Sequence, residues 1–221
     1  SSPGSATVSG LADGGHTFKV RAVDAVGNIS TVATRSWTVD RTAPVVVLVS
    51  PVNGAVVGSS SVTVSGSASE SSDVTVSVTG ETAQVVSVVA GLWTATFTGL
   101  TGGVLSISAS QTDAAGNTGT SATVSFSVDV TAPSVSITSG PVDASTSNSA
   151  SATFGFSSAA SDLARFECEL DGAGFGACGT SSPGSATVSG LADGGHTFKV
   201  RAVDAVGNIS TVATRSWTVD R

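Results

Sequence analysis

An identical duplication constrains this chain more than any other feature of its sequence. Residues 181–221 repeat residues 1–41 letter for letter, so the second copy begins 180 positions after the first. Identity over so long a stretch indicates recent duplication of a unit within a longer protein. Units of this size stack as tandem arrays, and such arrays serve as spacers, stalks or fibres. We therefore expect one full period followed by the first 41 residues of the next.

A second, diverged repeat divides this period into two domains. A leucine, two aspartates, a glycine and an asparagine recur three times at constant spacing: Leu11, Asp24, Gly27, Asn28 and Asp40; Leu100, Asp113, Gly116, Asn117 and Asp129; Leu191, Asp204, Gly207, Asn208 and Asp220. The first two copies continue into Thr-Ala-Pro, at 42–44 and 131–133. This pattern predicts the C-terminal half of a domain over 1–41 and complete domains over 42–130 and 131–221.

Alternating apolar and polar residues predict β-strands in both domains. On the stretch 196–203, Phe198 and Val200 share one side, whereas Lys199 and Arg201 share the other. The pattern predicts strands near 134–138, 151–157, 164–170, 175–178, 185–189, 196–203 and 213–219 in the last domain. In residues 42–130 it predicts strands over 45–50, 61–67, 74–78, 85–89, 93–97, 105–110 and 122–128.

Seven short strands per domain, separated by turn residues, are typical of an immunoglobulin-type sandwich. The predicted fold is all-β, with tandem seven-stranded immunoglobulin-like β-sandwiches in a rod or fibre. The predicted core of residues 131–221 consists of Phe154, Phe156, Phe166, Phe198, Val200 and Trp217. Trp37 and Trp93 occupy core-facing positions of their own strands.

Charge and composition narrow the class of partner. Only 11% of the residues are charged and the net charge is −7, whereas phosphate binding needs concentrated Lys and Arg, so we do not expect nucleic acid. No apolar run is long enough to span a bilayer.

Low charge and abundant Ser and Thr indicate an extracellular or cell-surface location. The absence of Met and of a signal peptide indicates a piece of a longer protein.

Several stretches of the chain resemble a known family. FECELDG, LADGGHTFKVRAVDAVGN and WTVDR are similar to the bacterial immunoglobulin-like repeats of large cell-surface and secreted proteins. PVNGAVV, SVTVSGSAS, DAAGN and SVDVTAP, within 42–133, resemble a neighbouring subfamily of these repeats. The resemblance covers the whole chain and implies adhesins, biofilm proteins, stalks and, less often, accessory domains of extracellular enzymes.

Acidic residues gather where the predicted topology brings one domain to the next. The loops after the second and sixth strands share a pole with the end of the preceding domain, which groups Asp40, Glu70, Asp73 and Asp113 at one joint and Asp129, Asp162 and Asp204 at the other. Carboxylates and backbone carbonyls suit Ca²⁺, and the resemblance to adhesins implies calcium at such joints. The alternative is that Asp24, Asp113 and Asp204 cap turns beside Gly-Asn.

The cysteines and histidines favour structural roles. Cys168 and Cys178 flank the turn 171–174, and a disulfide there would close one hairpin; a metal half-site would lack His or Cys partners nearby. His16 and His196 are copies of one position, where a bond to the backbone is expected rather than base catalysis. Lys199 and Arg201 are expected to pair with Glu167 and Glu169 on the adjacent strand. Asn28 and Asn208 also begin N-glycosylation sequons.

Residues 1–41 supply only the last three strands of a sandwich. Phe18, Val20, Ala22, Trp37 and Val39 would present an uncovered apolar face. Either the preceding stretch of a continuous array covers it, or residues 131–180 of another molecule do.

We therefore expect a non-enzymatic structural segment, a stalk, adhesin spacer or surface filament that gives reach and stiffness. The expected partners are neighbouring repeats of the same protein and other copies in a filament. Two alternatives remain open. One is an immunoglobulin-like module that binds carbohydrate or protein through its loops. The other is an accessory domain of a secreted hydrolase.

Overall fold

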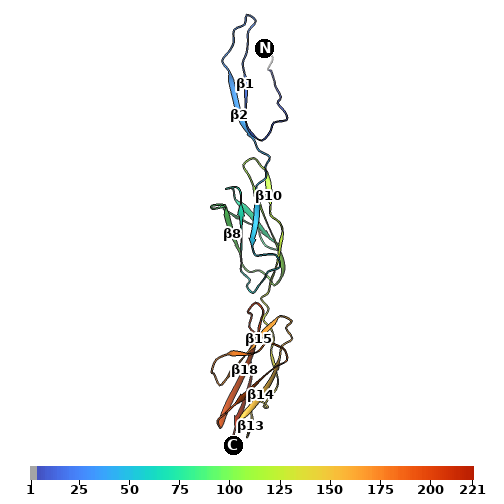
Figure 1. The fold of residues 1–221 in the computed structure, drawn as a ribbon, viewed down its shortest axis with the longest axis vertical. Coiled ribbons are helices and arrows are strands. Elements are labelled where there is room, and N and C mark those ends of the chain that lie inside the picture. Colours follow the sequence, from blue (N-terminus) through green and yellow to red (C-terminus); the bar gives the residue numbers. More distant parts are fainter. Residues whose placement is uncertain (1–3) are drawn as a thin grey trace. The chain divides into compact units, whose positions relative to one another are not determined.

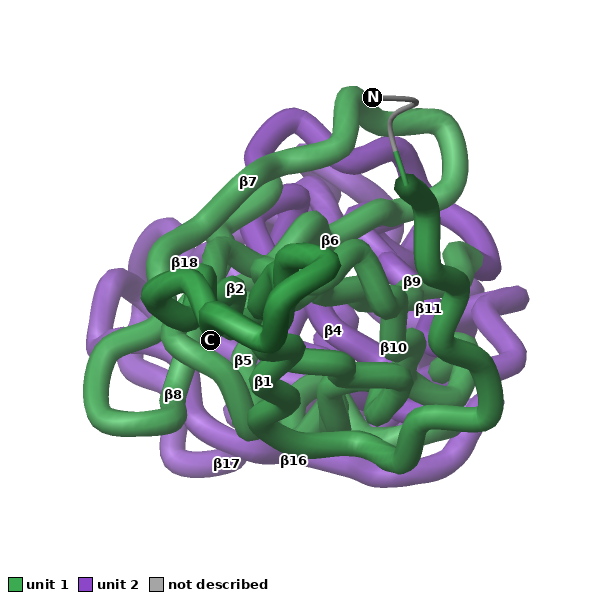
Figure 2. Tube along the Cα trace, turned by 90° about the horizontal axis from the view of Figure 1, so that it is seen from above, with its two compact units in different colours: residues 1–53, 63–97, 105–125 green, residues 54–62, 98–104, 126–221 purple. Residues whose placement is uncertain are grey.

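The computed structural model of the protein describes residues 4–221, and this part of the chain forms strands and no helix (Figure 1). Accordingly, the described residues include no helix of the length and hydrophobicity needed to cross a membrane. The chain divides into two compact units, coloured separately in Figure 2. Unit 1 comprises residues 1–53, 63–97 and 105–125, and unit 2 comprises residues 54–62, 98–104 and 126–221.

Unit 1 begins with the first copy, a name used below for residues 4–41. In it, β1 (Gly14–Val20) pairs antiparallel with β2 (Ala33–Val39), and together they form a sheet of two strands. The side chain of Val20 is 52% exposed, and those of Phe18 and Trp37 are half-buried. The predicted apolar face is therefore present, and it is only partly covered.

Two larger sheets follow the first copy. One has the order β3-β5-β8, with strands β3 (Val46–Ser50), β5 (Val62–Ala68) and β8 (Leu92–Phe97). The other has the order β4-β11-β9-β6-β7 with β10 on β9, and its strands are β4 (Val56–Val57), β6 (Val74–Val78), β7 (Gln84–Val86), β9 (Gly103–Thr112), β10 (Thr118–Thr120) and β11 (Val124–Val128). Strict alternation buries Val64, Val74, Val76, Trp93 and Ile107, as the pattern of these strands predicts.

Residues 136–219 of unit 2 form another pair of sheets. The smaller sheet has the order β12-β14-β17, with strands β12 (Ser136–Ser139), β14 (Ser151–Ser157) and β17 (Gly184–Ser189). The larger has the order β13-β19-β18-β15-β16, with strands β13 (Ser145–Ser147), β15 (Leu163–Leu170), β16 (Gly176–Gly179), β18 (Gly194–Asp204) and β19 (Ala213–Val219). Two sheets with this strand order, packed over one core, are an immunoglobulin-like sandwich.

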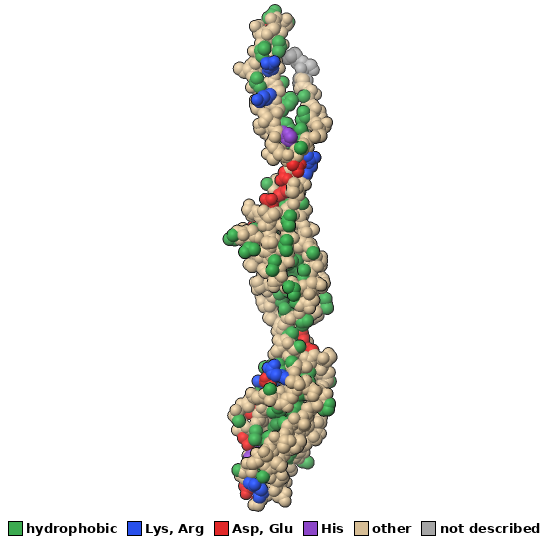
Figure 3. Space-filling view, in the orientation of Figure 1, with side chains coloured by type: hydrophobic (Ala, Val, Ile, Leu, Met, Phe, Trp, Pro, Cys, Tyr) green, Lys and Arg blue, Asp and Glu red, His purple; other side chains and the backbone are tan. Residues whose placement is uncertain are grey.

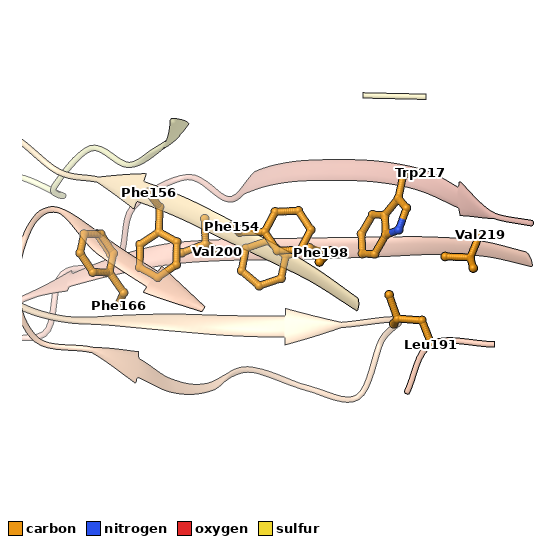
Figure 4. Packing of buried hydrophobic residues seen from close by; sticks show 10 residues of the cluster. Phe154, Phe156, Phe166, Leu191, Phe198, Val200, Trp217 and Val219 are labelled. Carbon is orange, nitrogen blue, oxygen red and sulfur yellow. The ribbon is translucent and has the colours of Figure 1, made fainter. Parts of the chain in front are cut away.

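Aromatic rings fill the core of this sandwich (Figure 4). Phe154 of β14 stacks on Phe198 of β18 with ring centroids 4.0 Å apart, and Phe156 meets the edge of Phe166 at 4.9 Å. All six predicted core residues are buried: Phe154, Phe156, Phe166, Phe198, Val200 and Trp217. On the surface, charged side chains are few and hydrophobic ones lie scattered among polar groups (Figure 3).

The structure adds three short strands to the predicted set. They are β4, β10 and β13, each of two or three residues, too short for alternation to reveal. β4 and β13 are added to their sheets by parallel pairing with β11 and β19 respectively. The expectation that residues 1–41 supply three strands was also wrong: residues 5–9, the counterpart of the predicted strand 185–189, form no strand. Their identical copy, 185–189, lies on β17 and pairs with β14, and the first copy has no such partner.

Candidate functional site

A five-residue turn, residues 204–208, begins at the last residue of β18 and is closed by hydrogen bonds to the carboxylate of Asp204. The Oδ1 atom of Asp204 accepts hydrogen bonds from the backbone N–H groups of Val206, Gly207 and Asn208, at 3.0, 2.8 and 2.8 Å. Its Oδ2 atom accepts a hydrogen bond from Asn208 Nδ2 at 2.8 Å. Gly207 has a φ of 98°, which favours glycine. Burial would raise the pKa of Asp204, but the hydrogen bonds from Asn208, Val206 and Gly207 hold that pKa below its ordinary value.

The same turn occurs three times, at residues 24–28, 113–117 and 204–208, which we call the Asp-Asn turns. In the first, Asp24 accepts hydrogen bonds from Asn28 N at 2.8 Å and from Asn28 Nδ2 at 2.7 Å. In the second, Asp113 accepts the corresponding bonds from Asn117 N and Nδ2, both at 2.8 Å. The predicted capping role of these aspartates is therefore confirmed, and the glycine before the asparagine, rather than the asparagine itself, takes the positive φ.

The asparagines make a second bond that sequence reasoning missed. Asn117 Nδ2 donates to the backbone oxygen of Asp40 at 3.1 Å, and Asn208 Nδ2 donates to that of Asp129 at 3.0 Å. Each acceptor is the aspartate that precedes a Thr-Ala-Pro stretch. The recurrence of asparagine at constant spacing was the signal that could have indicated this role. Both hydrogens of Asn208 Nδ2 are therefore engaged in hydrogen bonds.

The structure brings one of the two predicted carboxylate groups together. Oxygens of Asp129, Asp162 and Asp204 lie within 4.8 Å of one another. Asp162 is exposed, Asp129 is half-buried and Asp204 is buried. A cleft of about 400 Å³ adjoins the first two, lined also by Thr131, Ala132, Pro133, Ser134 and residues 159–161. Three carboxylates at this separation repel one another, so the site can hold a divalent cation with oxygen ligands.

The other predicted group is not assembled in the described part of the chain. Asp40, Glu70, Asp73 and Asp113 contain no set of three carboxylates at such distances. The physical reason lies in Gln111, which is 1% exposed and whose Nε2 atom donates to the backbone oxygens of Glu70 and Ser72 at 2.9 and 2.6 Å. The loop is thus held by its backbone, and the side chains of Glu70 and Asp73 are exposed.

A glycine allows close approach of the chain at the third turn. A Cβ atom at Gly58, directly after β4, would lie 2.8 Å from the backbone oxygen of Val206 and 3.0 Å from its Cβ. Any larger residue would require the turn to shift. Sequence reasoning did not single out Gly58, because nothing in its neighbourhood distinguishes it from the other turn glycines.

The remaining chemical groups have structural roles. Cys168 and Cys178 form a disulfide between β15 and β16, as predicted. His196 Nε2 bonds the backbone oxygen of Ala192 at 2.8 Å, which confirms the predicted backbone bond. Its Nδ1 atom bonds Asp171 Oδ2 at 2.7 Å, a partner that sequence reasoning missed.

Ion pairs cross from β15 to β18 as predicted. Lys199 pairs with Glu169 at 2.8 Å, and Arg201 pairs with Glu167 at 2.7 Å. Glu167 also accepts from Arg165, and the two guanidinium groups, Arg165 first, hold its pKa below the usual range. Such surface pairs contribute little to stability but fix the register of the two strands.

Comparison with known proteins gives matches among solved structures only. No family model matches the chain, and no curated protein matches its sequence. Among solved structures, the fibronectin(III)-like modules of Clostridium thermocellum CbhA match with 21% identity over 80% of this chain and 94% of theirs, at a TM-score of 0.47. The chicken CNTN1 FN1–FN3 domains match with 13% identity over 93% and 78%, at 0.44. A chimeric titin Z1Z2 matches with 17% identity over 83% and 100%, at 0.35.

The sheet orders define the class of the protein independently of these similarities. It is an all-β protein of immunoglobulin-like sandwich architecture. Its distinctive polar site is the Asp-Asn turn bonded to a backbone oxygen near Thr-Ala-Pro.

Proposed function

We propose that this chain is a segment of an extracellular structural repeat, a spacer or stalk, whose domains are residues 42–130 and 131–221 and whose role is reach and stiffness. The observation that carries the proposal is the bond from Asn117 or Asn208 to the end of the preceding domain. A spacer keeps its length when the joints between its domains resist bending. Each of these asparagine side chains bonds both to the aspartate of its own turn and to the backbone of the preceding domain, so it restricts bending at the joint. The disulfide supports an oxidising, extracellular location.

Proline and close packing support the same role at residues 129–134. Pro133 fixes its own φ and restricts Ala132, so this connection has few accessible conformations. Asp129 Oδ1 accepts a hydrogen bond from Thr131 N at 3.0 Å, which closes a local turn at the start of the connection. The contact of Gly58 with Val206 adds a second point of restraint in the same unit.

The test measures the width of a distance distribution between spin labels at the exposed positions Thr94 and Thr187. Replacing Asn208 by Ala removes the bond to Asp129 and should broaden that distribution. Asn28→Ala is the matched control, because Asn28 lies in an identical turn whose side chain, within the described residues, bonds only Asp24. An Asn208→Ala distribution as narrow as that of the control would contradict the proposal.

The carboxylate cluster extends this proposal to calcium at the second joint. A Ca²⁺ ion held by Asp129, Asp162 and Asp204 would neutralise their repulsion and tie residue 129 to the turn. Calorimetric titration with CaCl₂ should show one site, and the melting temperature should fall when EDTA is added.

Asp162→Asn should abolish the heat of binding, because it removes a charged ligand that makes no other hydrogen bond among the described residues. Asp73→Asn, outside the cluster, should leave binding unchanged. If neither EDTA nor Asp162→Asn changes the melt, the aspartates act only in turns.

A further inference from the structure

The two copies of one 41-residue sequence differ in what covers them. In the second copy, residues 181–221, Phe198 is 1% exposed, Val200 is 0% exposed and Trp217 is 3% exposed. The identical residues of the first copy are half-buried or exposed, and Val20 reaches 52%. Since the sequences are identical, this difference comes entirely from the surrounding chain.

Residues 131–180 provide the cover in the second copy. Phe154 stacks on Phe198 at 4.0 Å and meets Trp217 at 5.2 Å between ring centroids. β15 lies beside β18 as its neighbour in the sheet, and Cys168 pairs with Val200 in that register. The face of β1 and β2 carries the same apolar residues in the same register, with His16 opposite Trp37 as His196 is opposite Trp217.

Ion pairs, in addition to apolar contacts, hold residues 131–180 on the second copy. Glu169 pairs with Lys199, Glu167 with Arg201, and Asp171 with His196, so three acidic residues of β15 and its turn meet three basic residues of β18. The identical basic residues of the first copy are Lys19, Arg21 and His16. Within residues 4–221, none of these three makes an ion pair. An incoming strand with acidic residues at the spacing of 167, 169 and 171 would match them.

We propose that the β1–β2 face of the first copy is a binding site for a segment with the sequence of residues 131–180, supplied by a neighbouring repeat of the same protein. The inference depends on the proposed function only for the source of this segment. The segment 131–180 of the same molecule is already bound to residues 181–221. Its transfer to the first copy would uncover an identical face and gain no contacts, so the occupant is an additional segment.

The test uses the full 221-residue chain and a dye-labelled polypeptide of residues 131–180 with its disulfide formed. Fluorescence anisotropy should show saturable binding of one polypeptide per chain. Phe18→Asp should weaken binding at least about tenfold, because it places a carboxylate where Phe154 would stack. Thr31→Asp is the matched control, since the identical Thr211 is exposed in the covered copy and lies outside β18 and β19, and it should bind like the unchanged chain. Unchanged circular dichroism would show that both variants remain folded.

The ion pairs provide a readout of register. Lys19→Glu with Arg21→Glu should weaken binding about tenfold, because two attractive pairs become repulsive. A polypeptide carrying Glu167→Arg and Glu169→Lys should restore it. Binding that is indifferent to both charge reversals would show non-specific apolar contact and overturn the proposal. So would insensitivity to Phe18→Asp, or self-association of the chain through Phe18 with no uptake of the polypeptide. None of these outcomes bears on the Asn208→Ala distance measurement, so failure of this inference is distinguishable from failure of the proposed function.

Discussion

Phe18 and Phe198 have identical neighbours in sequence and different surroundings in the structure. Phe198 contacts Phe154 face to face, whereas Phe18 is half-buried on a two-stranded sheet. The contribution of a side chain to stability therefore depends here on residues far away in the chain. A molecule that holds the same residue in both settings provides its own control.

Replacing Phe198 by Ala should lower the free energy of unfolding by about 3–5 kcal/mol, because it leaves a cavity among packed rings. Phe18→Ala should cost about 1 kcal/mol or less, because its site can collapse or fill with water. Urea denaturation of both variants, followed by far-ultraviolet circular dichroism, measures the difference. Equal losses would show that the first copy is as well packed as the second.

The Asp171–His196 pair should make stability depend on pH. The bond to the Ala192 oxygen and then that to Asp171 raise the pKa of His196, so its contribution is complete below pH 6.5 and is lost as pH rises through the raised value. Burial would raise the pKa of Asp171, but hydrogen bonds from His196 and Thr197 lower it, so its contribution is lost as pH falls below 3.8.

Thermal melts of the unchanged chain and of Asp171→Asn, between pH 3 and pH 9, measure this dependence. The variant should lose the part of the decline above pH 6.5 that comes from Asp171, and should keep the part that comes from the bond to the Ala192 oxygen. A variant that retains the full decline would place its origin elsewhere, and His16→Gln, which changes the copy without an acidic partner, controls for the second histidine.

At the scale of strands, sequence patterns predicted the long elements well. The alternation that places Phe198 and Val200 on one side predicted β18, and its neighbours followed in the same way. β13 could not be found, because the three residues Ser145–Ser147 have no alternation and pair only where β19 lies beside them. Residues 5–9 form no strand because the first copy lacks the partner strand that their identical copy has. Local sequence does not reveal whether such a partner is present.

The disulfide stabilises a single hairpin. Cys168 and Cys178 are ten positions apart, and closing so short a loop is worth about 2–3 kcal/mol by the chain-entropy relation. The double substitution Cys168→Ser and Cys178→Ser should lower the stability of the β12–β19 sandwich by this amount and leave the β3–β11 sheets unchanged. Two separate transitions in a calorimetric melt, of which only one moves, would meet the expectation. A shift of both would contradict it.

At the scale of the whole molecule, the repeat predicted where the Asp-Asn turns lie, but it predicted only one of the two carboxylate groups correctly. Constant spacing from aspartate to asparagine indicated a turn in each copy, and the topology indicated which aspartates would meet. The group of Asp129, Asp162 and Asp204 assembled, but the group around Asp113 did not. The difference depends on the buried Gln111, which holds its loop by backbone oxygens, and no local pattern identifies such a contact.

The parallel pairing of β13 with β19 has a mechanical consequence. Ser145–Ser147 lie alongside Trp217–Val219, near the start and the end of one sandwich. Tension applied between residues 131 and 221 would draw these strands past each other along their common axis, so their hydrogen bonds would be loaded together in shear rather than broken one after another. β4 and β11 repeat this arrangement at Ser127 and Val56. When such a strand pair is pulled, all its hydrogen bonds carry the load at the same time. The force that ruptures it should therefore exceed the force that unzips a hairpin from one end.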